Sequence, residues 1–518
     1  MSNMIVKNLN FGDEARTKIF EGIEKLTKAV SSTLGASGKC VILEDGGGNP
    51  IITKDGVTVA ENIILRDPVE NMGATLLKQA AKKTVQEAGD GTTTATVLAH
   101  AMLEQAYGIL DKKNVREIKE GINTAVEEVL KYLDSISIPV EDKMLDNVAT
   151  ISTNNDKVLG KLIADAFREV DKTGVVMMEV SVSGETKVEI IDGAQYPKGI
   201  VSPHFITNKE KKTAELDNPV VLIIDSEVSN IRQIQGILEY VIKNKKSLLI
   251  IGDLEPDVLT ALAMNKTKGN IKVNVIEAPV LGINRKQILD DIALLTNAVV
   301  INEDLGDDMD VINIDFLGTC SKSVTNQDET IIQIQETKPE TLSIIKELKK
   351  ELKTCKIPDQ IISLEKRLAR LAAKIAVVKI GANSEVELKE KLDRAEDAIC
   401  ATKAAIKEGI VPGGGVALLN AAMKVDEKNK GERVLTASIL SPYKTILLNA
   451  GSEQITIPAE DGHGVNVLTG EVVNMVKAGI IDPLLVTKSA LKNAASVATT
   501  ILSTDCVINN LRVDESNR

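Results

Sequence analysis

The sequence predicts a multi-domain α/β protein, in which both ends of the chain build one helix-dominated domain and the middle forms an inserted α/β domain. Helical periodicity runs from about Phe11 to Leu133, and strands alternate with helices from Val220 onward. Past Gly381 the chain returns to a helix-rich, Ala-rich character punctuated by glycine. A chain of 518 residues is long enough for several domains. A discontinuous domain explains why the two end blocks are alike.

A short hairpin interrupts the first helical block. Residues 41–44 and 49–53 flank a Gly-rich turn at 45–48, and we expect them to pair as two strands. Asp67-Pro68 then opens another helix, because proline is favoured in the first helical turn. The residues expected to share a face of that helix are Met72, Leu76, Leu77 and Ala80.

The middle of the chain alternates between strands and helices. Its character changes near Pro139, and strand-like runs follow at 175–180 and 187–191. Beyond them, continuous apolar runs separated by helices are typical of a mostly parallel sheet covered on both faces. The expected strands are 220–224, 248–251, 271–276 and 298–301, and the expected helices are 231–242, one opened by Pro256, and 288–295.

Two long amphipathic helices are expected after this series. With Pro358 between them, they are predicted to form an antiparallel helical hairpin. Their apolar positions are Ile344, Ile345, Leu348 and Leu352 in the first helix and Ile361, Leu364, Leu368 and Leu371 in the second.

The segment from Ala88 to Ala99 indicates a phosphate site at the start of a helix. Gly89 and Gly91 let the backbone approach a ligand closely. The first turn of a helix leaves N–H groups unpaired and carries partial positive charge, and the threonines at 92–94 add hydroxyls. Asp90 would repel a phosphate unless a divalent cation lay between them, which indicates Mg²⁺ and a nucleotide.

Two other interpretations of this segment stay open at this point. The first is an ordinary Asp-Gly turn before a threonine-rich helix, although three β-branched residues are poor helix formers and cost stability without a ligand. The second is a small-molecule kinase or phosphatase that uses Asp90 and Mg²⁺ to modify a metabolite. Neither 35–39 nor 412–415 has P-loop spacing, which argues against an ordinary P-loop enzyme.

Composition argues against several other classes of protein. With 74 acidic and 62 basic residues and no long basic run, nucleic acid and anionic membranes have little support as partners. A long apolar stretch and a secretory signal are both lacking, so a cytoplasmic location is expected. The five cysteines are odd in number and far apart, as expected for reduced, mostly buried thiols. The three histidines lie in unrelated contexts, which leaves zinc and histidine-based catalysis without a basis.

Short strings run in a matching order along nearly the whole chain. They are Thr33-Leu34-Gly35, Ile52-Thr53-Lys54-Asp55-Gly56-Val57, Glu70-Asn71-Met72-Gly73-Ala74, Gly89 to Leu98, Ser229-Asn230-Ile231-Arg232, Glu396-Asp397-Ala398 and Gly413-Gly414-Gly415-Val416-Ala417. In these strings the chain resembles a group I chaperonin of the GroEL type. The resemblance implies an equatorial ATPase domain (1–136 and 410–518), a small α/β intermediate domain (137–192 and 382–409) and an inserted α/β apical domain that binds clients (193–381).

The resemblance also implies where a nucleotide binds. Thr33 and Gly35 match positions that line the phosphates, and Asp90 matches the Mg²⁺ ligand. Gly414 matches the backbone beside the ribose, while Asn466 and Asp482 match nucleoside contacts. ATP and Mg²⁺ are the implied cofactors, with K⁺ as a further candidate. The implied nucleotide-binding residues are Thr33, Leu34, Gly35, Lys54, Asp90, Gly91, Thr92, Thr93, Thr94, Gly414, Asn466, Val467 and Asp482.

Asp55 and Asp397 are similar to the two catalytic carboxylates that hold the attacking water in this family. A loose phosphoryl transfer calls mainly for an aligned nucleophile and neutralised oxygens. In the family, Asp397 would reach the nucleotide only when the intermediate domain swings down, which couples hydrolysis to closure. The positions that match hinge regions are Pro139, Gly193, Gly381 and Gly409, and a plain turn or helix end is the alternative for each of them.

The apolar rim that binds unfolded polypeptide and a co-chaperonin in the family is diluted here. His204 and Gln235 put polar groups where the family usually has an aromatic residue and a leucine, and Ala263 shortens an aliphatic side chain. Narrower or weaker client binding is therefore expected, with a locally repacked groove as the alternative. The matching positions are Ile200, His204, Phe205, Gln235, Leu238, Leu259, Ala263 and Met264.

The function that the resemblance implies is an ATP-driven folding chamber. A heptameric ring, expected to double to 14 subunits, would enclose non-native polypeptides under a co-chaperonin of the GroES type. The end of the chain at 511–518 lacks Gly-Gly-Met repeats and the stretch between Asn449 and Asn466 is short, which weakens the expectation of a double ring. The alternative is a divergent paralogue that acts as an ATP-switched binding or structural ring without general refolding.

Overall fold

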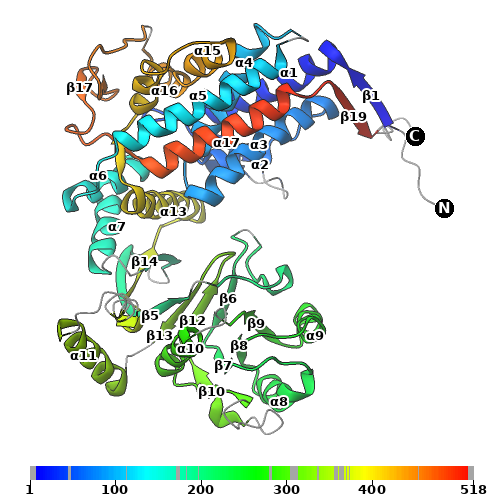
Figure 1. The fold of residues 1–518 in the computed structure, drawn as a ribbon, viewed down its shortest axis with the longest axis vertical. Helices are drawn as coiled ribbons and strands as arrows, with labels where there is room; N and C mark the ends of the chain where they lie inside the picture. The colour runs from blue at the N-terminus through cyan, green and yellow to red at the C-terminus, as the bar shows by residue number, and fades with distance from the viewer. Residues whose placement is uncertain are drawn as a thin grey trace. The chain divides into compact units, whose positions relative to one another are not determined.

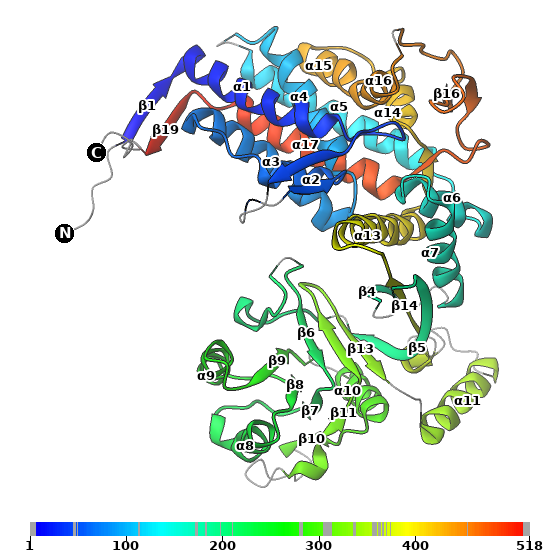
Figure 2. The ribbon, with the colours of Figure 1, turned by 180° about the vertical axis from the view of Figure 1, so that it is seen from behind.

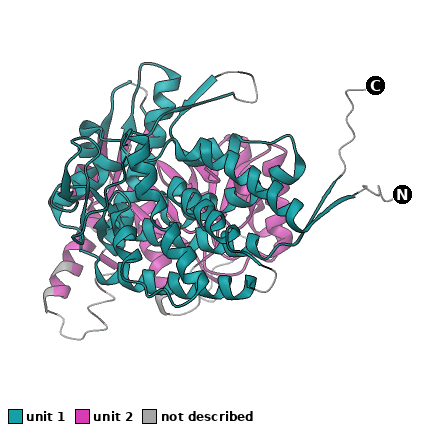
Figure 3. Cartoon of the chain, turned by 90° about the horizontal axis from the view of Figure 1, so that it is seen from above, with its two compact units in different colours: residues 1–164, 180–187, 379–518 teal, residues 165–179, 188–378 magenta. Residues whose placement is uncertain are grey.

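The chain divides into two compact units in a computed structural model. Figure 3 colours the first unit, residues 1–164, 180–187 and 379–518, and the second, residues 165–179 and 188–378. The first unit joins both ends of the chain, as the sequence predicts, whereas the division into three domains stays a prediction. The structure describes residues 7–44, 48, 50–111, 114–170, 175–181, 184–196, 198–209, 211–278, 283–303, 313–334, 338–354, 360, 364, 367–368, 370–372, 374–452 and 454–510.

Helices dominate the first unit (Figure 1). They are α1 (Gly12–Ser31), α2 (Gly56–Asn62), α3 (Pro68–Ala88), α4 (Thr92–Tyr107), α5 (Val115–Ser135), α6 (Asp142–Ser152), α7 (Lys157–Glu169, whose last residues are assigned to the second unit), α13 (Glu385–Glu408), α14 (Val416–Ala422), α15 (Lys430–Ser438), α16 (Ser441–Asn449) and α17 (Leu484–Leu502). Among the described residues, no helix combines the length and the apolar character needed to cross a membrane.

Short antiparallel strand pairs complete the first unit. Figures 1 and 2 show β1 and β19, from opposite ends of the chain, side by side. The predicted hairpin is confirmed, with Val41 opposite Thr53, although most of its turn lies outside the described residues. The pairs are β1 (Lys7–Phe11) with β19 (Cys506–Asn510), β2 (Val41–Glu44) with β3 (Pro50–Thr53), β15 (Ile410–Pro412) with β18 (Ile481–Pro483), and β16 (His463–Val465) with β17 (Val472–Asn474).

The core of the first unit forms around α4. Helix α4 packs against α1, α3, α15 and α17 and is apolar nearly all round, as expected of a helix inside a core. Helix α3 begins at Pro68 as predicted, and Asp67 caps it, because the carboxylate accepts hydrogen bonds from two backbone N–H groups of the first turn. The buried face of α3 differs slightly from the prediction: Leu77 and Ala80 are buried, but Met72 is exposed and Gly73 faces the core instead.

Helices α1 and α3 approach closely at Gly73, and this contact gives a stability prediction. A Cβ at Gly73 would lie 2.2 Å from the carbonyl oxygen of Ile19 on α1. We expect Gly73→Ala to lower the free energy of unfolding by roughly 1–3 kcal/mol, because backbone must move to admit the methyl group. Gly108→Ala is the control, because the nearest atom there is 3.6 Å away. Equal urea midpoints for the two variants would contradict this packing.

Two sheets organise the second unit. In the first, β10 (Val300–Ile301), β7 (Val220–Ile224), β8 (Ser247–Ile251) and β9 (Lys272–Ile276) lie in that order and run parallel, as predicted. β11 (Gly318–Thr319), which the sequence analysis missed, pairs antiparallel with β7. The second sheet has the order β4 (Val175–Val180), β14 (Lys374–Ile380), β5 (Lys187–Tyr196), β13 (Thr330–Ile334), β12 (Lys322–Thr325) and β6 (Ala214–Asp217).

Both faces of the parallel sheet are covered, again as predicted. Leu222 and Ile250 lie in one core cluster with residues of α8 (Gln235–Lys243) and α9 (Pro256–Thr267). Ile223 and Leu249 point to the opposite face, where α10 (Ile283–Thr296) and the second sheet cover them. The predicted helix at 231–242 begins as a 3₁₀ turn (Ile231–Ile234) before α8, and the last strand is shorter than the predicted 298–301.

The predicted helical hairpin is described only in part. α11 (Pro339–Thr354) contributes Ile345 and Leu348 to a core cluster that also holds Leu371. Pro358 and Ile361 lie outside the described residues. The described cysteines are free, as expected, but of these Cys320 alone is buried, whereas Cys400 and Cys506 are half-buried and Cys40 is exposed.

Candidate functional site

One cavity of about 510 Å³ in the first unit collects every residue that the sequence analysis assigned to nucleotide binding or hydrolysis. A volume of this size suits a cofactor-sized ligand. Its lining comes from segments scattered over the chain, which meet around the start of α4. The predicted residues that line it are Thr33, Leu34, Gly35, Lys54, Asp55, Asp90, Gly91, Thr92, Thr93, Thr94, Asp397, Gly414, Asn466, Val467 and Asp482.

The turn before α4 presents the start of that helix to the cavity. Gly89 and Gly91 adopt φ values of 73° and 90°, in the left-handed region that favours glycine. A Cβ at Gly91 would also lie 2.7 Å from a methyl group of Val486. Gly91 is the N-cap of α4 and offers no side-chain cap, so N–H groups of the first turn remain available for an anion.

Two further loops pack directly on this first turn. A Cβ at Gly56 would lie 2.3 Å from Oγ1 of Thr93, which shows how tightly the 53–56 loop approaches α4. The hydroxyls of Thr33 and Thr93 are 3.4 Å apart. Asn449 holds the 31–34 loop through hydrogen bonds from its Nδ2 to the carbonyls of Ser31 and Leu34. Backbone and hydroxyl donors therefore converge on one end of the cavity.

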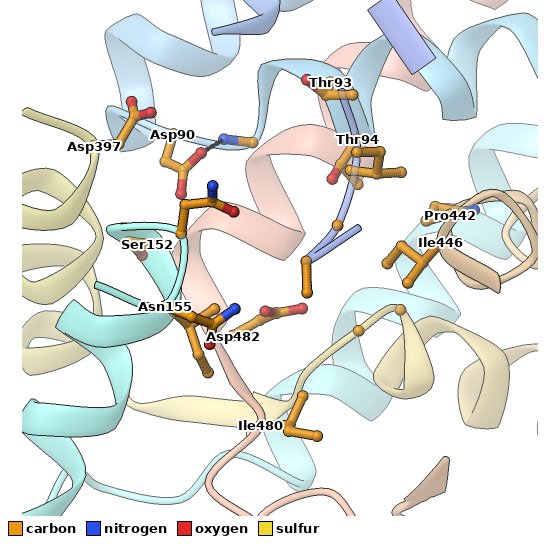
Figure 4. Close-up of a pocket in the computed structure, with 18 of the residues that line it drawn as sticks. Asp90, Thr93, Thr94, Ser152, Asn155, Asp397, Pro442, Ile446, Ile480 and Asp482 are labelled. Atoms are coloured by element: carbon orange, nitrogen blue, oxygen red, sulfur yellow. Dashed lines mark hydrogen bonds between the residues drawn. The ribbon is translucent and has the colours of Figure 1, made fainter. Parts of the chain in front are cut away.

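Carboxylates gather at the same end. Figure 4 shows Asp90 and Asp397 near one another, with Asp482 farther along the cavity. Burial raises the pKa of Asp90, and the nearby Asp55 raises it further. Burial and the charges of Asp90, Asp55 and Asp393 hold the pKa of Asp397 well above its usual value. Burial, together with Asp90, raises the pKa of Asp482 to about 7. A cation bound here would relieve this repulsion.

The donor set at Asp90 fits Mg²⁺. One of its carboxylate oxygens accepts a hydrogen bond from the N–H of Gly91, which leaves the other oxygen for a ligand. No group of three or more acidic, His or Cys side chains that could hold a metal occurs among the described residues. Mg²⁺ does not need one, because it commonly binds through one or two carboxylates, substrate phosphates and water.

Asp55 is held firmly in place as the N-cap of α2. Its Oδ1 accepts from the N–H of Val57 at 3.1 Å, and its Oδ2 accepts from the N–H and the hydroxyl of Thr58 at 2.8 and 2.7 Å. These bonds hold the carboxylate in position, and they occupy about three of its four acceptor sites.

Apolar side chains also line the cavity. Pro442 and Ile446, from α16, lie at one side of the cavity in Figure 4, and Ile480 lies beyond Asp482. Sequence reasoning missed all three. Ile480 could have been found, because it lies two residues before Asp482, immediately before β18 begins at Ile481. Pro442 and Ile446 carry no local signal, since only tertiary packing brings α16 to the cavity.

Sequence reasoning also missed a charged face of α13. Four charged residues at helical spacing on α13 line the cavity: Glu390, Asp393, Arg394 and Asp397. Asp397 thus lies in the cavity wall in this structure, and α13 belongs to the same compact unit as α4. The spacing from Asp397 was the signal that could have revealed the other three.

The positions that match hinges show local packing reasons for their residue types. A Cβ at Gly193 would lie 2.1 Å from the side chain of Ile375, and one at Gly381 would lie 2.1 Å from the carbonyl oxygen of Gly184. Gly409 ends α13 with φ 88°. Pro139 is exposed. The hinge roles of these residues stay predictions.

The positions that match the client rim divide into exposed and buried groups. His204, Gln235 and Met264 are exposed, whereas Phe205 is 0% exposed and lies in the core beneath α8 and α9, and Ala263 is buried as well. The expected rim therefore loses its aromatic residue to the core. Ile200, Leu238 and Leu259 are half-buried and pack against the same cluster.

Comparison with known proteins identifies the family. The chain matches the TCP-1/cpn60 chaperonin family over residues 26–512. It is similar to two crystal forms of the chaperonin gp146 from the bacteriophage EL 2 (Pseudomonas aeruginosa), both solved in the presence of ATP-BeFx. Form II has a TM-score of 0.71 and 23% identity and covers 99% of this chain and 100% of that chain. Form I has a TM-score of 0.65 and 22% identity and covers 97% and 99%. With the GroEL-like fold and a family match along nearly its whole length, the chain belongs to the TCP-1/cpn60 chaperonin family.

Proposed function

We propose that this protein is an ATP-dependent chaperonin that binds non-native polypeptides and promotes their folding. The observation that carries the proposal is a cavity in which the uncapped start of α4 meets Asp90, Asp55 and Asp397. The N–H groups of α4 would bind the phosphates, and Asp90 would hold Mg²⁺, with K⁺ as a further candidate cation. Mg²⁺ supplies neutralisation of phosphate charge when bound. Pro442, Ile446 and Ile480 would receive the base.

Hydrolysis in this proposal depends on alignment of water by Asp397 and Asp55. The nucleotide can shift the protein between two states only if it binds them unequally, and contact with α13 supplies such a difference. Closure of the segment that carries α13, through the hinges at Pro139, Gly193, Gly381 and Gly409, would couple hydrolysis to the client-binding unit.

We further propose that the chain assembles into a heptameric ring, doubled to 14 subunits, and works with a co-chaperonin of the GroES type in the cytoplasm. Exposed apolar side chains on short strands support contacts between copies: Phe11 is 60% exposed on β1 and Ile42 is 70% exposed on β2. Sizing by light scattering with ATP, followed by electron microscopy, tests the assembly. A stable monomer at micromolar concentration would contradict it.

A second candidate function is an ATP-switched binding or structural ring with few clients. The exposed polar residues at the rim favour it. Gln235 is exposed on α8, where its Nε2 donates to Glu239 at 2.7 Å, and Phe205 is withdrawn into the core. Refolding of a denatured client with and without co-chaperonin separates this function from the first.

Client capture by the intact ring without nucleotide is expected to be about tenfold weaker than by a standard chaperonin, because losing one buried apolar side chain of leucine size costs about 1.5 kcal/mol. Gln235→Leu should recover much of the affinity. Thr260→Leu, an exposed position of α9, serves as the control for added apolar area. Capture equal to that of the standard chaperonin, with no gain in Gln235→Leu, would rule out a weakened rim.

A further inference from the structure

Four charged side chains of α13 line the cavity, and they differ in whether they have a hydrogen-bond partner among the described residues. Arg394 donates from Nη2 to Glu390 at 2.7 Å and from Nη1 to the carbonyl of Thr153 at 3.3 Å. Arg394 thus pairs with Glu390 and ties α13 to the end of α6, although its buried Nε has no hydrogen-bond partner among the described residues. Asp393 and Asp397 accept no hydrogen bond and form no ion pair with another residue that the structure describes.

The position of Asp393 makes it a neighbour of Asp397. The two residues are four apart on one helix, so their side chains lie on the same face, one turn from each other. Asp393 is half-buried at the cavity wall. Burial and the charges of Asp55, Glu396 and Glu390 raise its pKa to about 6, while Lys389 lowers it. The Asp393 side chain thus lies partly buried in the cavity wall.

Asp55, by contrast, keeps only about one acceptor site for the water molecule, so it can contribute one hydrogen bond to its alignment. Three hydrogen bonds from α2 occupy its two oxygens, and an ionised carboxylate offers about four acceptor sites. Alignment of a nucleophile requires acceptors that are fixed in place and still free. Among the described carboxylates of α13 that line the cavity, Asp393 and Asp397 keep their oxygens free of other residues, and the helix holds both on one face.

We propose that Asp393 is a second water-positioning residue of α13, which accepts a hydrogen bond from the attacking water beside Asp397. The inference rests on the proposed ATPase function. In that reaction the water oxygen forms a bond to the γ-phosphorus, and the bond from that phosphorus to the bridging oxygen breaks. ADP leaves with the bonding electron pair, and the proton of the water passes to the phosphate product. Asp393 keeps the water in line during this exchange.

The test compares Asp393→Asn with wild type in steady-state ATP turnover. We expect kcat to fall about ten- to a hundredfold, the worth of one charge-assisted hydrogen bond, while KM stays level or falls, because a negative charge near the phosphates is removed. Glu385→Gln makes the same chemical change at an exposed site on α13 and should keep both constants. Asp393→Glu should restore part of kcat.

The outcomes separate this inference from the proposed function. Wild-type protein that neither binds nor hydrolyses ATP overturns the function itself. Wild-type turnover that Asp393→Asn leaves unchanged overturns the role of Asp393 alone. A parallel loss of kcat, of affinity and of thermal midpoint in both Asp393→Asn and Asp393→Glu shows a structural role and also overturns it.

Discussion

Replacing Asp397 with alanine is expected to remove most ATP turnover and to leave nucleotide binding intact. The carboxylate lines the cavity near Asp90 and has no hydrogen-bond partner among the described residues, so its loss leaves no polar group unpaired. What is lost is an acceptor for the attacking water. Misalignment of a nucleophile costs roughly 100-fold or more in kcat.

Nucleotide affinity should stay equal or tighten in this variant. Asp397 is one of several carboxylates that repel each other in the cavity, and alanine removes one negative charge beside the phosphates. Phosphate release measures kcat, and titration with a fluorescent nucleotide measures the dissociation constant. Glu385→Gln again serves as the control on α13. A variant that loses binding together with turnover would show that Asp397 holds the nucleotide rather than the water.

The parts of the fold that the sequence predicts well are those with a strong local signal. The strand at 220–224 is a continuous apolar run between turns, and the structure buries every residue of it. The start of α4 at Thr92 follows from the paired glycines and the apolar spacing beyond them. Asp67 before Pro68 marks the start of α3 because both the cap and the proline act within one turn.

The interior of the second unit was harder to predict, because it depends on packing between distant segments. Phe205 matches a rim position, but the turn that carries it is held inward. Nζ of Lys266 on α9 donates to the carbonyls of His204 and Ile206, at 2.9 and 2.8 Å, and the ring between them enters the core. No residue near Phe205 in the sequence indicates this contact, because Lys266 lies 60 residues beyond Ile206.

The candidate site likewise has residues that local sequence signals predict and residues that depend on packing between distant segments. Glycines, threonines and aspartates with unusual spacing mark the phosphate end in the sequence, because each of them serves a local requirement of backbone conformation or of charge. Pro442 and Ile446, by contrast, resemble any other helix residues, and only the packing of α16 gives them a place in the cavity. The pairing of Arg394 with Glu390 could be inferred from their spacing. That Asp393 lines the cavity without a hydrogen-bond partner among the described residues could be seen only in the structure.

Asp90→Asn is expected to have the largest effect on the chemistry, with a fall in turnover on the order of 100- to 1000-fold. The amide keeps an oxygen to accept from the N–H of Gly91, so the turn before α4 should persist. It cannot replace the anionic oxygen that Mg²⁺ prefers. The effect of Asp90→Asn on turnover can therefore be measured in a variant that is expected to fold.

For Asp90→Asn, the nucleotide dissociation constant measured with and without Mg²⁺ tests the cation site more directly than turnover does. In wild type, Mg²⁺ should strengthen binding, because Asp90 repels phosphates unless a cation lies between them. In the variant this repulsion is gone, so binding in EDTA should improve while the gain from Mg²⁺ largely disappears. Asp482→Asn makes the same change at another raised-pKa carboxylate of the cavity and should keep the Mg²⁺ dependence. If Asp90→Asn kept both its turnover and its response to Mg²⁺, the cation would have to bind elsewhere, and the start of α4 would bind phosphate without it.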